Sequence, residues 1–128
     1  ILNSEAVIVC PSNPIVSIGT ILSVRGVRDV LKKTRAKVVA VSPIVGGAPI
    51  KGPADKLMLG LGLEVSAYAV AALYRDFLDA FIIDSADEAH KPRIEALGIR
   101  AFVTNTIMRT LEDKVQLADA VLGLIEKL

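Results

Sequence analysis

Short apolar runs alternate with helix-patterned segments along all 128 residues, and this alternation constrains the fold more than any other feature. Apolar runs predict strands at residues 6–10, 37–41, 64–66, 80–84 and 100–104. Helical spacing or helix-end signals predict helices at residues 26–35, 53–61, 68–78, 86–97 and from 110 onward. Such alternation indicates an α/β fold with a mainly parallel sheet. We therefore predict one domain over residues 1–128, a Rossmann-like three-layer arrangement of four to five strands flanked by helices.

Burial and helix ends can be predicted for some of these elements. The uninterrupted apolar run 6–10 is typical of a strand buried on both faces. Pro53 and Gly62 flank the second helix as an N-terminal proline and a C-terminal glycine. Thr110 and Asp113 have the spacing of a capping box at the start of the last helix. In that helix we expect an apolar stripe to face the core: Leu111, Val115, Ala118, Val121, Leu122 and Ile125.

Most of the unusual residues lie in the loops that follow the predicted strands. These loops are residues 11–23, residues 42–52, the turn after Asp84, and residues 105–109. Parallel strands joined by right-handed crossovers bring such loops to one edge of the sheet, where open α/β folds bind their ligands. We therefore expect a ligand site at this edge.

The first of these loops combines two prolines with small polar side chains. Ser12, Asn13 and Pro14 follow Pro11 directly, and a second polar turn, with Ser17 and Gly19, comes soon afterwards. One interpretation is an Asx-type turn that closes the strand. The other is a preorganised set of hydrogen-bonding groups for a ligand, which the second turn favours.

The second loop, SPIVGGAPIKGPADK, is glycine-rich and basic. It offers adjacent glycines, Lys51 and Lys56, and a helix that starts near Pro53, all of which suit a phosphate or another anion. It is not a Walker A loop, because the G-x-x-x-x-G-K-[ST] pattern is absent. The alternative is a solvated loop with surface lysines.

Composition excludes several classes of protein. The net charge is +1 with interleaved signs, aromatic residues make up 4% and Trp is absent, which argues against a general nucleic-acid-binding surface. The apolar runs are too short to cross a bilayer and no signal-peptide pattern is present, so we expect a cytoplasmic protein without a membrane partner. The single Cys10 excludes an internal disulfide and leaves no zinc-ligand spacing.

No residue pattern indicates covalent catalysis. Cys10 is expected to be buried packing, and the only histidine, His90, is expected on the surface of a charged helix. Asp84 could bind a metal or a ribose hydroxyl, but an Asp in this position more often caps the next helix. What remains is a site of hydroxyls, amides and lysines, suited to binding a phosphorylated ligand and to transfer by positioning and charge stabilisation. No catalytic residue is assigned.

Four segments resemble one enzyme family: CPSNPIVSIGTIL, VVAVSPIVGGAPIKGPADKLM, GLEVSAYAVAALYRDFLDAFIID, and TIM before the last helix. Together they resemble the C-terminal part of 2-phospho-L-lactate transferases. The resemblance implies transfer of a 2-phospholactyl-type group from a guanosine diphosphate-activated donor to the deazaflavin alcohol Fo. GMP is released, Mg²⁺ takes part, and the product belongs to coenzyme F-420 biosynthesis. It further implies a homo-oligomer.

The resemblance also assigns candidate residues and points to departures. It implies a substrate or nucleotide site lined by Ser12, Asn13, Pro14, Ser17, Ile18, Ser42, Pro43, Gly52 and Lys56. Thr20 and Arg25 stand where the family would have proline nearby, and Asn105 stands where it usually has Asp. Family members also carry an N-terminal half with a glycine-rich phosphate loop and acidic metal ligands. We therefore expect this chain to be the C-terminal half of a longer one, inactive by itself and without its own metal site.

Two other functions use the same features. The same loops would serve a nucleotide-sugar-binding regulatory protein of the superfamily that has no catalysis. An interaction domain that dimerises through an open sheet edge is the third hypothesis.

Overall fold

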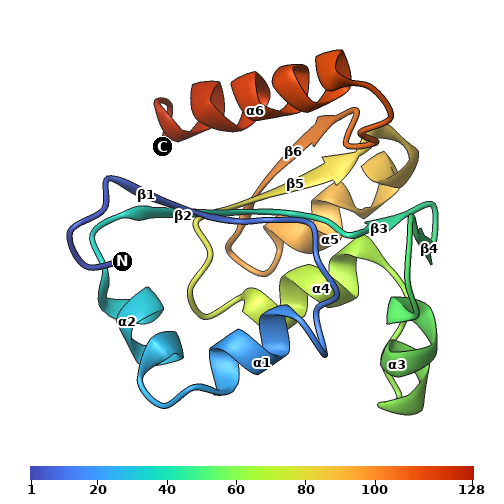
Figure 1. The fold of residues 1–128 in the computed structure, drawn as a ribbon, viewed down its shortest axis with the longest axis horizontal. Helices are drawn as coiled ribbons and strands as arrows, with labels where there is room; N and C mark the ends of the chain where they lie inside the picture. The colour runs from blue at the N-terminus through green and yellow to red at the C-terminus, as the bar shows by residue number, and fades with distance from the viewer.

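The computed structural model describes residues 1–128 and has the expected Rossmann-like α/β architecture (Figure 1). Four parallel strands form a sheet in the order β1-β2-β5-β6. They are β1 (Ala6–Val9), β2 (Lys37–Val41), β5 (Ala80–Asp84) and β6 (Arg100–Thr104). A separate antiparallel hairpin consists of β3 (Ile44–Val45) and β4 (Ala48–Pro49). The helices are α1 (Ile18–Ser23), α2 (Val27–Lys33), α3 (Ala54–Gly60), α4 (Ala67–Tyr74), the 3-10 helix η1 (Ser85–His90), α5 (Lys91–Glu95) and α6 (Leu111–Ile125).

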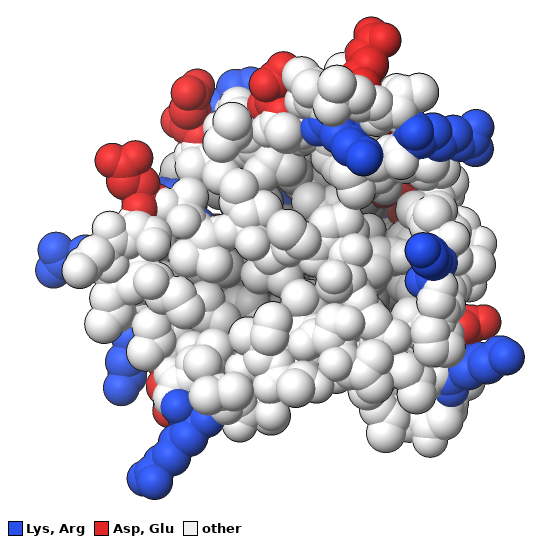
Figure 2. Space-filling view, viewed as in Figure 1, with Lys and Arg blue, Asp and Glu red and all other residues white.

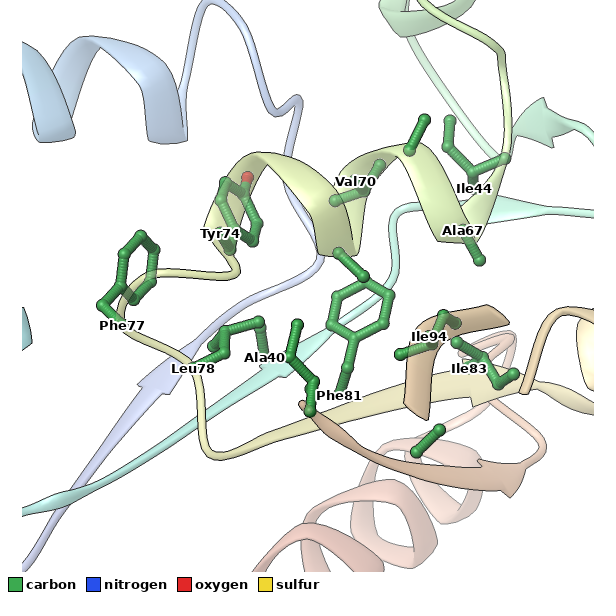
Figure 3. Close-up of a cluster of buried hydrophobic side chains, with 14 of the residues drawn as sticks. Ala40, Ile44, Ala67, Val70, Tyr74, Phe77, Leu78, Phe81, Ile83 and Ile94 are labelled. Atoms are coloured by element: carbon green, nitrogen blue, oxygen red, sulfur yellow. The ribbon is translucent and has the colours of Figure 1, made fainter. Parts of the chain in front are cut away.

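The sheet separates two apolar clusters of unequal size. The larger one packs α2, α4 and α5 against one face, around Phe81 and Tyr74 (Figure 3). On the other face α6 alone covers the sheet, with Leu117, Val121 and Leu124 packed on β2 and β5 (Figure 1). None of the helices is both long and apolar enough to span a membrane.

Strand burial follows position in the sheet. Every residue of β5 is buried, as is β2 after its first residue, which suits central parallel strands with continuous apolar sequence. Within these 128 residues, the first strand does not have the predicted burial on both faces. β1 is an edge strand paired only with β2, and its Ile8 is exposed.

Several local predictions also need correction. Residues 64–66 form no strand, because Ser66 instead caps α4 and its Oγ accepts from the Ala69 N–H at 3.1 Å. The helix predicted over 86–97 is divided into η1 and α5, with Pro92 in the first turn of α5. The helix α1 and the β3–β4 hairpin were not predicted; each is only a few residues long, too short for periodicity to reveal.

The last helix begins as predicted but buries a different side. Its capping box is present: Thr110 Oγ1 accepts from the Asp113 N–H at 3.2 Å, and Asp113 Oδ2 accepts from the Thr110 N–H at 2.7 Å. Of the predicted stripe only Val121 is fully buried, together with Leu117 and Leu124 outside it. The helix has two adjacent apolar rows, and periodicity alone does not decide which one meets the sheet.

Candidate functional site

A cavity of about 450 Å³ lies at the edge of the sheet where the parallel strands end. Four segments line it: residues 11–17 after β1, residues 42–45 after β2, residues 49–54 leading into α3, and residues 106–108 after β6. Below, residues 11–17 are called the elbow and residues 105–108 the Thr106 loop. The prediction that the loops after the strands gather at one edge is therefore confirmed for the loops after β1, β2 and β6; the turn after Asp84 does not line the cavity.

Six of the nine predicted site residues line the cavity: Ser12, Asn13, Ser17, Ser42, Pro43 and Gly52. The other three do not. Pro14 is buried beneath the elbow, and Ile18 begins α1 and packs toward the larger apolar cluster. Lys56 lies exposed on α3, outside the lining, whereas Lys51 in the preceding loop lines the cavity.

The elbow is shaped by Asn13. Its Oδ1 accepts from the Ile15 N–H at 2.9 Å and the Val16 N–H at 3.2 Å, and its carbonyl accepts from the N–H groups of Ser17 and Ile18. This is the Asx-type turn considered above. The Asn13 Nδ2 group makes no hydrogen bond within the chain, so the same side chain still has donors for a ligand.

Gly19 lets α1 approach the elbow closely. A Cβ at this position would lie 2.9 Å from the Pro14 carbonyl oxygen, closer than real Cβ contacts allow. Glycine is therefore needed because there is no room for a Cβ, and its small size lets α1 begin directly after the turn that carries Ser17.

The adjacent glycines have a structural task. Gly46 and Gly47 form the two-residue turn of the β3–β4 hairpin, with φ of 58° and 81°, a conformation that favours glycine at both positions. They do not line the cavity, whereas Val45 and Pro49 from the same hairpin do. Asp87 from η1 holds the turn, because its buried carboxylate accepts from the Gly46 N–H at 3.1–3.2 Å.

The Thr106 loop is tied to β5 through Asp84. The buried Asp84 Oδ2 accepts from the Thr106 N–H at 2.8 Å and from the Thr106 hydroxyl at 3.2 Å. Its Oδ1 accepts from the Ala86 N–H at 3.0 Å and caps η1. Burial opposes ionisation of Asp84, but these hydrogen bonds together outweigh it and hold its pKa below the ordinary value. Asp84 therefore acts as a cap and a tether.

The lining favours an anionic ligand. It contains Lys51 and no Asp or Glu, and the hydroxyls of Ser12 and Ser17 make no hydrogen bond within the chain. The Ser42 hydroxyl, by contrast, is buried and bonded to the backbone of Ile44. Free hydroxyl donors beside an ammonium group, without a competing carboxylate, suit phosphate oxygens.

Comparison with known proteins shows which family the chain resembles in sequence. The family model described as 2-phospho-L-lactate transferase CofD matches residues 1–119. The chain belongs to this family. A 2-phospho-L-lactate transferase of Methanosarcina barkeri is 51% identical over 97% of the chain, and one of Methanocaldococcus jannaschii is 48% identical over 92%. A phosphoenolpyruvate transferase of Kitasatospora aureofaciens is 41% identical over 99%. The chain spans 36–40% of the length of these relatives.

The residues of this member of the family do not fit a magnesium site. No three His, Cys, Asp or Glu side chains come close enough together to hold a metal ion. Mg²⁺ is held through carboxylate oxygens, and the two buried carboxylates near the cavity, Asp84 and Asp87, are both bonded to backbone N–H groups. Asn105, at the position where Asp is usual, accepts from the Ile107 N–H at 3.1 Å and shapes the Thr106 loop.

Two further expectations concern sulfur and histidine. Cys10 is exposed, not buried, because it lies just past the end of an edge strand. His90 ends η1 and is half-buried rather than fully on the surface. Neither lines the cavity. Sequence reasoning placed residues 105–109 at the right edge and named both Lys51 and Lys56 as groups suited to an anion, but the set of site residues included only Lys56. Thr106 was not named; its position just after a strand was the available signal.

Proposed function

We propose that the chain is part of a transferase that moves a 2-phospholactyl-type group from a guanosine diphosphate-activated donor to the deazaflavin alcohol Fo. The transfer releases GMP and is a step in the biosynthesis of coenzyme F-420. The cavity binds the phosphate-bearing part of the nucleotide. Membership of the transferase family supports the reaction class, and the cavity of free hydroxyls and Lys51 without an acidic side chain supports the ligand.

In this proposal the chain binds and orients the reactants. The Lys51 ammonium group neutralises diphosphate charge, and the Ser12 and Ser17 hydroxyls donate to phosphate oxygens. The hydroxyl oxygen of Fo forms a bond to a phosphorus of the donor and loses its proton to the solvent, while the bond from that phosphorus to the GMP oxygen breaks and GMP leaves with the electron pair. Positioning and charge stabilisation are the main contributions to such phosphoryl transfer.

Mg²⁺, expected from the family, would neutralise charge on the diphosphate. Because the residues of this chain do not fit a metal site, we propose that the ligands of Mg²⁺ lie outside these 128 residues. The names of the relatives differ in the transferred group, phospholactate in some and phosphoenolpyruvate in others. The proposed phosphoryl transfer is the same for either acid.

Calorimetric titration of a full-length polypeptide that contains this chain tests the proposal. We expect GDP to bind more tightly than a uridine diphosphate sugar. Preference for the uridine compound would instead support the regulatory, nucleotide-sugar-binding function. An assay with Fo and each activated acid, followed by detection of GMP, then identifies the donor.

A further inference from the structure

One side of the molecule exposes an apolar surface that has no part in the reaction proposed above. It consists of the edge strand β1 and one row of side chains on α6: Leu111, Val115, Ala118 and Leu122. This surface is called the β1 face below. In Figure 1 β1 lies nearest the viewer, so Figure 2 shows this face.

The α6 row is apolar by pattern and exposed by position. Its spacing of four, three and four residues places the side chains on one side of the helix. Leu111 is 77% exposed and Leu122 54%, although each is a large aliphatic side chain. Since the adjacent row, with Leu117 and Val121, already packs on the sheet, this second row is free for another surface.

The row faces the β1 side of the sheet. The end of α6 is fixed on the opposite side by Arg100 of β6, whose guanidinium donates to the Lys127 carbonyl at 3.3 Å. The exposed row is rotated about the helix axis from the buried row, in the sense that leads away from β6 and toward β1. There Ile8, in register with Val39 beneath α6, is 44% exposed. The α6 row and Ile8 therefore border the same uncovered strip of the sheet.

The edge of β1 carries none of the usual features that prevent pairing. Its sequence Ala-Val-Ile-Val has no charge, no proline and no polar side chain, and its far edge has no partner strand. Such an edge pairs readily with another strand. The opposite edge strand, β6, begins with Arg100 and ends with Thr104, so the two edges of the sheet differ in character.

Charge is absent around β1 in this view. Figure 2 shows Lys, Arg, Asp and Glu around the rim and over α6 at the top, while the middle of the view, which β1 crosses in Figure 1, contains none. A contiguous uncharged area with a charged rim is typical of a surface that another polypeptide covers.

We infer that the β1 face is covered by the remaining part of a transferase polypeptide, which continues the sheet with a strand beside β1 and packs apolar side chains on the α6 row. The length of the relatives supports this occupant, because more than half of each lies outside the region that this chain matches. The elbow follows β1 directly, so the covering part also lies next to the cavity.

Cysteine labelling tests the inference without relying on activity. The test uses a chimera as long as the M. barkeri relative, in which this chain replaces the segment of that relative that it matches. Leu122→Cys reports on the exposed row, and Ala120→Cys, also exposed in this structure but on the opposite side of α6, is the matched control. Both are made with Cys10→Ser, because Cys10 is itself exposed.

We expect maleimide to label the thiol at position 122 about tenfold or more slowly than the thiol at position 120, at all protein concentrations, with equal rates in denaturant. Equal rates in the native protein would overturn the inference, and so would slow labelling at both positions. Protection at position 122 that disappears on dilution would assign the face to a second copy and overturn the proposed occupant. Loss of GDP binding alone would contradict the proposed function and leave this result unchanged.

Discussion

The elbow and the Thr106 loop line the same cavity, but different interactions hold them. The Thr106 loop is tied across the sheet edge to the buried carboxylate of Asp84. The elbow is held by hydrogen bonds between near neighbours around Asn13, and the helix that follows it, α1, buries no residue fully. Hydrogen bonds to a buried charge are stronger than exposed hydrogen bonds between near neighbours. The Thr106 loop is therefore the rigid wall of the cavity, called the first wall, and the elbow is the adaptable one, called the second wall.

This difference assigns the two walls separate tasks. A wall anchored to the central strand β5 sets the shape of the cavity before a ligand arrives. The elbow carries Ser12, Asn13 and Ser17 on a locally held turn, so it opens at a lower free energy and, in the proposed function, adjusts to the phosphate groups of the ligand. Substitutions in the first wall should therefore affect folding, and those in the second should affect binding.

The largest expected effect is that of Asp84→Ala. It removes the acceptor for the N–H groups of Ala86 and Thr106 and for the Thr106 hydroxyl. We expect the free energy of unfolding, measured in urea, to fall by about 3 kcal/mol. Ser85→Ala is the control, since this neighbouring side chain is exposed and unbonded. Equal losses in the two variants would show that the tether does not stabilise the fold.

The stability lost in Asp84→Ala should also depend on pH. Because the folded-state pKa of Asp84 lies below its ordinary value of 3.8, its stabilisation is complete above that value and is lost as pH falls through the folded-state pKa. The stability difference between wild type and Asp84→Ala should thus shrink below about pH 4. A difference that stays constant down to pH 2 would contradict an ionised tether.

Asp87→Ala should have the next largest effect. It leaves the Gly46 N–H without its acceptor and should reduce the free energy of unfolding by about 2 kcal/mol. Hydrogen exchange at Gly46 measures the local loosening of the hairpin. Glu88→Ala, at an exposed neighbour, should leave that exchange rate unchanged. Unchanged exchange in Asp87→Ala would remove Asp87 as the anchor of the hairpin.

The two lysines test where the cavity binds charge. We expect Lys51→Ala to weaken GDP affinity about tenfold, or about 1.4 kcal/mol, with little change in melting temperature. Lys56→Ala is a matched control, because that side chain is exposed outside the lining. Calorimetric titration of each variant with GDP measures the two affinities. A greater loss in Lys56→Ala would place the phosphate groups elsewhere.

The smallest effect on stability is expected at the elbow. Asn13→Ala removes the Oδ1 acceptor and should cost about 1 kcal/mol of unfolding free energy. Asn13→Asp keeps that acceptor but loses the amide donors and adds negative charge, so it should be nearly as stable as wild type and bind GDP more weakly. Wild-type affinity in Asn13→Asp would leave Asn13 as a turn-forming residue only.

Much of the site was predictable because it follows from topology. Parallel strands must end at one edge, so alternating elements place Ser12, Ser42 and residues 105–109 together before any contact is known. The choice between Lys51 and Lys56 was not predictable in this way. Both lie near the start of α3, and the direction of that helix and the path of the preceding loop decide which lysine meets the cavity.

The sequence by itself determined the α/β class, the order of the main elements, the capping box of α6 and membership of the transferase family. These depend on local periodicity, on hydrogen bonds between near neighbours, or on motifs. Only the tertiary structure decided that β1 is an edge strand, that Asp84 and Asp87 are tethers, and that the Leu117 row of α6 is buried in place of the Leu111 row. Each of these depends on residues far apart in the chain, whose spacing carries no information on which surfaces meet.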